Sequence, residues 1–150
     1  MIARPERVLS ASGFFEALAA TLVRRLPPAL RNFEAVRGPG RLMKLDYGRP
    51  ETHFEAWHHR AVGRLELGLH FEGERQLNAA AHGFFRSRIV EIKRVLPRAE
   101  LEPWDRGWAR LYETVPAPEL SDRSLSVAVE RLTAYITVLQ PMLTEFWESR

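Results

Sequence analysis

The chain has 150 residues, of which 45% are hydrophobic and 27% are charged, a composition that is typical of a globular protein and excludes an intrinsically disordered one. It contains no cysteine, which excludes disulfide bonds, thiolate catalysis and cysteine-ligated zinc, and fits a reducing compartment. No apolar run approaches the roughly 18 residues of a membrane-spanning helix, and Glu16 interrupts the apolar stretch near the N-terminus, so we reject a signal peptide. We therefore expect one cytoplasmic domain over residues 1–150, with no membrane partner.

The net charge of +3 is distributed unevenly along the chain. Residues 24–49 contain seven basic side chains and two acidic ones, whereas residues 111–150 contain three basic and six acidic ones. Basic side chains neutralise the phosphates of nucleic acids, so Arg41 and Lys44 are candidate contacts to such a partner. The alternative interpretation of the same residues is a well-solvated surface.

Two helical segments are predicted ahead of the first strand. In residues 12–26 the apolar side chains recur every three or four positions, which is typical of an amphipathic helix, and either Ser10 or Ser12 can cap its first turn. The two prolines that follow end this helix, because proline removes a backbone donor and constrains the residue before it. We expect residues 29–36 to form a second, short helix and residues 37–40 to form a loop.

The stretch of residues 53–72 is predicted to be the central β-hairpin. Two runs of alternating polar and apolar residues flank residues 62–63, and such alternation is typical of strands with one buried face. A tight turn at these two residues pairs Phe54 with Phe71 and separates an apolar face from a polar one. The polar face contains His53, Glu55, Trp57, His59, Glu66, Gly68, His70 and Glu72. Another strand is expected at residues 41–47.

After the hairpin the apolar period changes from two to about 3.6, which predicts a single long helix over residues 77–96. Residues 100–104 and 107–114 again have the pattern of strands. The closing helix starts after Ser121, a favourable N-cap. We expect Pro141 to kink or interrupt this helix, because proline cannot donate the helical hydrogen bond.

Together these elements predict an α+β fold. Consecutive strands with short connections favour an antiparallel sheet, and we expect four to five strands covered on one face by long helices. The closing helix carries a second apolar row of Ala128, Tyr135 and Met142 beside its main seam. Since large exposed apolar patches are uncommon on monomers, this row predicts a homodimer, unless Trp104 and Trp108 cover it.

The polar face of the hairpin is the best candidate for a functional site. Its candidate binding residues are Glu55, Trp57, His59, Glu66 and His70. Cross-strand partners lie about 5 Å apart, so a set made of Glu55, His59, Glu66 and His70 could ligate zinc, iron or manganese. The alternative is structural, because alternating opposite charges also fix the register of a solvated sheet face. Trp57 opposite Gly68 fits the second interpretation, as an aromatic ring that covers a glycine.

Glu91-Ile92-Lys93 is half of a signature of restriction-type nucleases, in which a Glu-x-Lys strand and an upstream aspartate bind a catalytic metal. The order of the predicted elements also matches that core. However, Glu91 and Lys93 fall within the predicted long helix, and the corresponding strand has Gly68 where lysine is required. These two observations argue against the nuclease hypothesis.

Several motifs between residues 53 and 146 together resemble one protein family. The motifs are Arg64–Glu72, Asn78, Phe84–Leu96, Pro103-Trp104-Asp105, Trp108–Tyr112 and the closing helix. Together they resemble an uncharacterised bacterial family, a domain of unknown function. Its members occur alone or behind restriction- or nuclease-like modules, which implies an accessory role. The resemblance supports the fold and carries no catalytic residue.

Two functional hypotheses follow from these residues. The first is a non-catalytic binding or accessory domain, without a cofactor, that acts on a nucleic acid or a protein partner. The second is a metal-dependent, nuclease-like hydrolase that uses the histidines and glutamates of the hairpin. The two differ in one measurable property, because the second requires a bound metal and the first does not.

Overall fold

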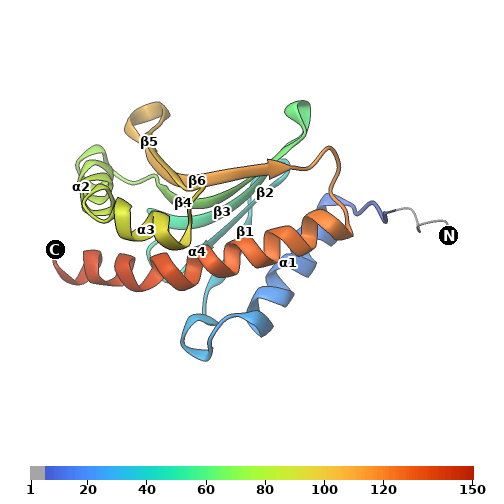
Figure 1. Ribbon diagram of the computed structural model, residues 1–150, viewed down its shortest axis with the longest axis horizontal. Coiled ribbons are helices and arrows are strands. Elements are labelled where there is room, and N and C mark those ends of the chain that lie inside the picture. The colour runs from blue at the N-terminus through green and yellow to red at the C-terminus, as the bar shows by residue number, and fades with distance from the viewer. Residues whose placement is uncertain (1–5) are drawn as a thin grey trace.

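The computed structural model describes residues 6–150, which contain a six-stranded antiparallel sheet in the order β1-β2-β3-β4-β6-β5 (Figure 1). The strands are β1 (Glu34–Arg37), β2 (Leu42–Asp46), β3 (Thr52–His59), β4 (Arg64–Phe71), β5 (Glu100–Pro103) and β6 (Ala109–Pro116). The helices are α1 (Ala11–Arg25), α2 (Arg75–Arg86), α3 (Ile89–Val95) and α4 (Asp122–Glu148). The predicted α+β class with an antiparallel sheet is confirmed.

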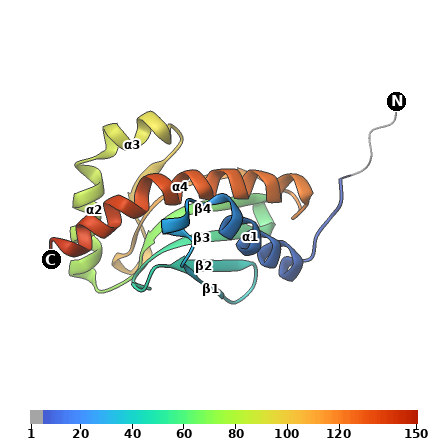
Figure 2. The ribbon, with the colours of Figure 1, turned by 90° about the horizontal axis from the view of Figure 1, so that it is seen from below.

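Helices α1 and α4 lie against one face of the sheet, as both ribbon views show (Figures 1 and 2). Their apolar stripes pack on the inward-facing residues of the central strands and form the core. The fully buried core residues include Phe14, Phe15, Leu18, Leu22, Leu67, Leu69, Leu132 and Ile136. Within residues 6–150 no helix covers the opposite face, so the polar side chains there are covered by one another and by the connection between β5 and β6.

The hairpin of β3 and β4 has the predicted faces in a register shifted by two residues. Phe54 pairs with Leu69, and Phe71 pairs with Thr52. The shift arises because the connection is a 3-10 turn closed by Gly63, whose φ of 63° lies in the left-handed region that glycine adopts without strain. A shift of two positions keeps every side chain on its own face, so the polar and apolar faces are those expected from the sequence.

Gly68 is approached by β6 and not by Trp57. Its Cα partners are Glu55 on one side and Tyr112 on the other. A Cβ atom at position 68 would lie 2.4 Å from the carbonyl oxygen of Leu111 and 2.7 Å from the Cβ of Tyr112. The prediction that Trp57 covers this glycine is therefore wrong, and the close approach of β6 to β4 explains why glycine occupies the position.

Two segments differ from the predicted helices. Residues 34–37 form the exposed edge strand β1, because pairing with β2 outweighs a weak local helical pattern, and this adds a sixth strand to the sheet. The helix predicted over residues 77–96 is divided into α2 and α3. At the break the Ser87 hydroxyl donates a hydrogen bond of 2.6 Å to the carbonyl oxygen of Phe84, which competes with the helical bonding pattern.

Helix α4 starts with a capping box of Ser121 and Ser124 and continues through Pro141 as one helical segment. Ala128 and Tyr135 of its second apolar row are fully buried within the chain. That row is therefore not the exposed patch from which we predicted a homodimer, and the dimer itself stays a prediction. None of the helices in the described part of the chain is both long and apolar enough to span a membrane.

Candidate functional site

The uncovered face of the sheet has a buried, highly polar centre. The side chains of His53 and Glu55 on β3, and of Glu66 and His70 on β4, are between 0 and 3% exposed. Glu72, directly after β4, is 9% exposed. The alternation of the two strands directs all five side chains to the same face, and the register places His53 opposite His70. We refer to these five residues as the His/Glu cluster.

Four members of the cluster, His53, Glu55, His70 and Glu72, each offer one ligand atom that lies within 4.8 Å of the other three. The Nε2 atom of His53 lies 3.1 Å from Oε1 of Glu55 and 3.8 Å from Oε1 of Glu72. The Nε2 atom of His70 lies 3.4 Å from Oε2 of Glu55. In a tetrahedral site with bonds of about 2.0–2.1 Å, the ligand atoms are separated by about 3.3 Å, so the four side chains, whose ligand atoms lie within 4.8 Å of one another, would have to draw closer around an ion.

His53 is oriented by the turn that precedes β3. Its Nδ1 atom lies 2.9 Å from the carbonyl oxygen of Pro50, and since a carbonyl oxygen can only accept, Nδ1 carries a proton. In the neutral ring, Nε2 then presents its lone pair to the oxygens of Glu55 and Glu72. These electron-rich atoms repel one another unless a proton or a metal ion lies between them. An Nδ1–H group held by a backbone carbonyl is also the usual arrangement of a metal-ligating histidine.

His70 is held between carboxylates at both ring nitrogens. Its Nδ1 atom lies 3.0 Å from Oε2 of Glu72, and its Nε2 atom lies 2.7 Å from Oε2 of Glu66. Burial alone would lower the pKa of His70, but these hydrogen bonds and the charge of Glu55 outweigh burial and raise the pKa to about 9. In metal-free protein at neutral pH, His70 is therefore an imidazolium that donates from both nitrogens.

Two further cations contact the cluster from its rim. The Nζ atom of Lys44 lies 3.3 Å from Oε1 of Glu72, and Nη1 of Arg110 lies 2.6 Å from Oε1 of Glu66. Burial alone would raise the pKa of Glu72, but the hydrogen bond from His70 and the neighbouring positive charges lower the pKa to about 2. The pKa of Glu66 is also lowered, since the hydrogen bond and charge of His70 and the charge of Arg110 outweigh burial. Both carboxylates are therefore ionised.

Aromatic rings shield the cluster from solvent. The Trp104 ring lies edge-on to His70, with 5.5 Å between the ring centroids. The guanidinium of Arg110 lies between two rings, 4.5 Å from the centroid of Trp104 and 3.9 Å from that of Tyr112. The Trp57 ring is 6.1 Å from Trp104 and extends this cover. Because these groups displace water, the electrostatic interactions beneath them are stronger than on an open surface.

The residues predicted as ligands from the sequence fall into two groups. Glu55 and His70 belong to the converging set of four, whereas His59 is 29% exposed and contacts the cluster through Glu66, with 3.2 Å between Nε2 and Oε1. Trp57 stacks on His59 at 4.0 Å between ring centroids. The set of four thus contains His53 and Glu72 in place of His59 and Glu66.

His53 and Glu72 are on the predicted polar face, but the predicted register placed them opposite each other at the open end of the hairpin. The observed register moves His53 opposite His70, towards the centre of the cluster. The signal that could have identified these two residues is the alternation itself, because a shift of two positions leaves both on this face.

The basic residues predicted to contact nucleic acid do not form one surface. Lys44 is paired with Glu72, as described above, whereas Nη1 of Arg41 lies 3.3 Å from Nδ1 of His58. His58 is on the face of the sheet that the helices cover, since it alternates with the polar residues of β3. Arg41 and Lys44 therefore contact opposite faces of the sheet.

The cluster can exist in two chemical states. In the first, the protonated imidazole of His70 and the charges of Lys44 and Arg110 neutralise the carboxylates, and the network is a self-contained set of ion pairs. In the second, a divalent cation replaces a proton of His70 and coordinates nitrogen and oxygen atoms of the cluster. Both states satisfy the buried charges, which is the condition for keeping such groups out of water.

Comparison with known protein families, with curated protein sequences and with solved structures finds no match for this chain. The resemblance to a bacterial family noted above therefore stays a prediction.

Proposed function

We propose that this chain is a non-catalytic binding domain that holds a divalent transition-metal ion at His53, Glu55, His70 and Glu72. The observation that carries the proposal is the convergence of one ligand atom from each of these side chains in a buried centre. Two imidazoles and two carboxylates suit zinc, manganese or iron. Calcium and magnesium prefer shells made of oxygen atoms, so they fit this set less well.

The surrounding residues support such an ion in two ways. The carbonyl of Pro50 fixes the tautomer and the orientation of His53. Glu66, 2.7 Å from Nε2 of His70 and anchored by Arg110, provides an additional carboxylate beside the site. An ion at this position links β3 to β4 and to the segment after β4, so its binding stabilises the fold.

The burial of the ligands argues for a non-catalytic role. A hydrolytic zinc site keeps one coordination position open for water. Here the four side chains are between 0 and 9% exposed, and the ring of Trp104 lies over His70. A substrate would have to displace this cover to reach the ion, so the hydrolase hypothesis is the weaker of the two.

The test is a zinc titration of protein made without a histidine tag and stripped with EDTA. Zn²⁺ is added in competition with a chromophoric chelator, and we expect one ion per chain. Because protons and metal compete for the same imidazoles and carboxylates, the affinity should be higher at about pH 8 than at about pH 6. Circular dichroism of each variant separates a lost site from a lost fold.

Variants locate the site. His53→Ala and Glu55→Gln should each weaken zinc binding by about 10-fold or more. His82→Ala, which removes an imidazole from α2, is the matched control and should leave the affinity unchanged. His59→Ala distinguishes the proposed set of four from the set predicted from the sequence, and we expect no loss. Failure of the wild type to bind zinc, or full affinity in His53→Ala, would contradict the proposal.

A further inference from the structure

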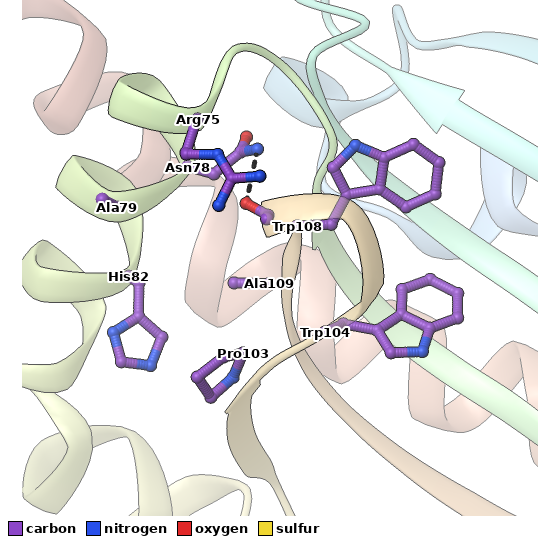
Figure 3. Close-up of a pocket in the computed structure, with 9 residues that line it drawn as sticks. Arg75, Asn78, Ala79, His82, Pro103, Trp104, Trp108 and Ala109 are labelled. Carbon is purple, nitrogen blue, oxygen red and sulfur yellow. Dashed lines mark hydrogen bonds between the residues drawn. The ribbon is translucent and has the colours of Figure 1, made fainter.

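Two adjoining hollows of about 240 and 390 Å³, which share His82 and Pro103, lie between helices α2 and α3 and strand β5, and we refer to them together as the groove. Figure 3 shows the first hollow, where Arg75 and His82 on α2 face the turn that joins β5 to β6. The second hollow continues past Arg86 to Lys93 on α3. The groove is distinct from the His/Glu cluster, none of whose members lines it.

The walls of the groove are basic. Arg75, His82 and Arg86 are seven and four residues apart, which places them on one face of α2, and α3 adds Lys93. The acidic residue among the lining residues is Glu100, which lies 3.7 Å from Lys93. Three permanent positive charges therefore face one negative charge along the groove, and the sign of this potential favours an anionic partner.

Two half-buried tryptophans belong to the β5–β6 turn, which forms one wall of the groove. Trp104 and Trp108 line the first hollow, with ring centroids 5.9 Å apart, and Figure 3 shows both rings on the far side of the turn from α2. The guanidinium of Arg106, at the tip of the turn, lies 5.5 Å from the Trp108 centroid and is 73% exposed. Basic side chains next to aromatic rings and a stacked arginine are typical of sites that bind single-stranded nucleic acid.

A small residue, Ala79, lines the first hollow between Arg75 and His82. No long side chain projects from α2 at this position, so a polymer backbone can approach the helix between Arg75 and His82.

We infer that this groove binds single-stranded nucleic acid. The phosphates lie along Arg75, Arg86 and Lys93, and a base stacks against Trp108 after the strand has passed over the β5–β6 turn. An acidic peptide would use the same charges but would leave the half-buried Trp108 indole without a role. The inference does not depend on the metal site, because the groove carries its own charges and rings.

The test is fluorescence anisotropy of labelled oligo-U and oligo-dT of about 12 nucleotides, a length within the usual range for such sites. We expect binding at about 50 mM salt that weakens linearly with the logarithm of the salt concentration. The double variant Arg86→Glu, Lys93→Glu should weaken binding at least 10-fold. Each phosphate contact removed should lower the magnitude of the salt slope by about 0.7.

The matched control is Arg24→Glu with Arg123→Glu, which changes the net charge equally at two exposed positions outside the groove. This control should keep most of the wild-type affinity. The single variant Trp108→Ala should bind about 10-fold more weakly than the wild type, which is the value of one stacked base. Equal losses in the two double variants, no binding at low salt, or equally good displacement by polyglutamate would each overturn the inference. The oligo-U and oligo-dT arms show whether RNA or DNA is preferred.

Discussion

His70 and Trp104 are in edge-to-face contact, with ring centroids 5.5 Å apart and an angle of 81° between the ring planes. His70 is the most buried member of the His/Glu cluster, and Trp104 lines the groove beside α2. The contact therefore joins the proposed metal site to the β5–β6 turn, which forms one wall of the proposed nucleic-acid groove. Any change of charge at His70 acts directly on the Trp104 ring.

Trp104→Ala should accelerate the release of zinc to an excess of chelator. The ring covers His70 and packs on Arg110, so its removal admits water to the ligands. We expect a release rate at least several-fold faster, measured by stopped-flow absorbance of the chelator. Phe33→Ala, which removes a half-buried ring that packs on Tyr47, is the control and should release zinc at the wild-type rate. Equal rates in all three proteins would show that Trp104 is not a cover.

The stability of the metal-free protein should fall at alkaline pH. The pKa of His70 is about 9 in the folded protein and 6.5 ordinarily, so its proton binds more tightly to the folded state. This contribution is complete below about pH 6.5 and is lost as the pH rises through about 9. One pKa unit corresponds to about 1.4 kcal/mol, so the loss is on the order of a few kcal/mol. Urea unfolding in EDTA at increasing pH measures it.

The acid side of the same profile has the opposite sign. The pKa of Glu72 is about 2 in the folded protein and 4.5 ordinarily, so its contribution is present above about pH 4.5 and is lost as the pH falls towards 2. The contribution of the cluster to the free energy of unfolding is therefore greatest between about pH 4.5 and about pH 6.5. His70→Gln should remove the alkaline decline and His82→Gln should retain it. A wild-type profile that stays flat from neutral pH to about pH 10 would contradict the arrangement around His70.

Gly68→Ala and Gly83→Ala should have opposite effects on stability. A Cβ atom at position 68 would lie 2.4 Å from the Leu111 carbonyl oxygen and 2.6 Å from the Tyr112 Cα atom, both of them backbone. The strands must separate to admit it, so we expect a loss of about 3 kcal/mol or more. Position 83 has nothing within 4 Å and lies in a helix, so alanine there should add about 1 kcal/mol. Thermal unfolding of the two variants measures the difference, and a tolerated Gly68→Ala would refute the pairing of β4 with β6.

Arg131→Met should destabilise the protein by about 3 kcal/mol, because it leaves the carboxylate of Glu113 buried without its cation. The two side chains pair at 2.7 Å between β6 and α4, and that of Glu113 is 2% exposed. Adding Glu113→Leu to Arg131→Met should recover most of the loss, since an apolar pair can replace a buried ion pair. Chemical unfolding of the single and double variants gives the coupling energy. Additive losses would show that the pair does not interact.

The sequence predicts strands β2 to β6 because each of these has a short local signal. The alternation on both sides of Gly63 identifies β3 and β4, and it assigns Glu55 and His70 to one face whatever the register. The register itself depends on the geometry of the four-residue connection, which the alternation does not encode. For this reason His53 is placed opposite Glu72 in the prediction and opposite His70 in the structure.

Features that depend on long-range packing are not predictable in the same way. Strand β1 forms because the β2 edge is available for pairing, although residues 29–36 have a helical pattern of their own. The cover of the cluster also needs Trp104, which is 34 residues after His70 and reaches it through the β5–β6 turn. The groove beside α2 is not predicted from the sequence, because its walls, α2, α3 and β5, come together only through long-range packing.

The most direct measurement of the central claim is X-ray absorption spectroscopy at the zinc edge on protein loaded with one equivalent of Zn²⁺. A site made of His53, Glu55, His70 and Glu72 predicts a first shell of nitrogen and oxygen atoms at about 2.0–2.1 Å, with outer-shell scattering from two imidazoles. The His53→Ala variant should show scattering from one imidazole fewer. A spectrum of a hydrated ion without imidazole scattering, or one unchanged in His53→Ala, would contradict the proposed site.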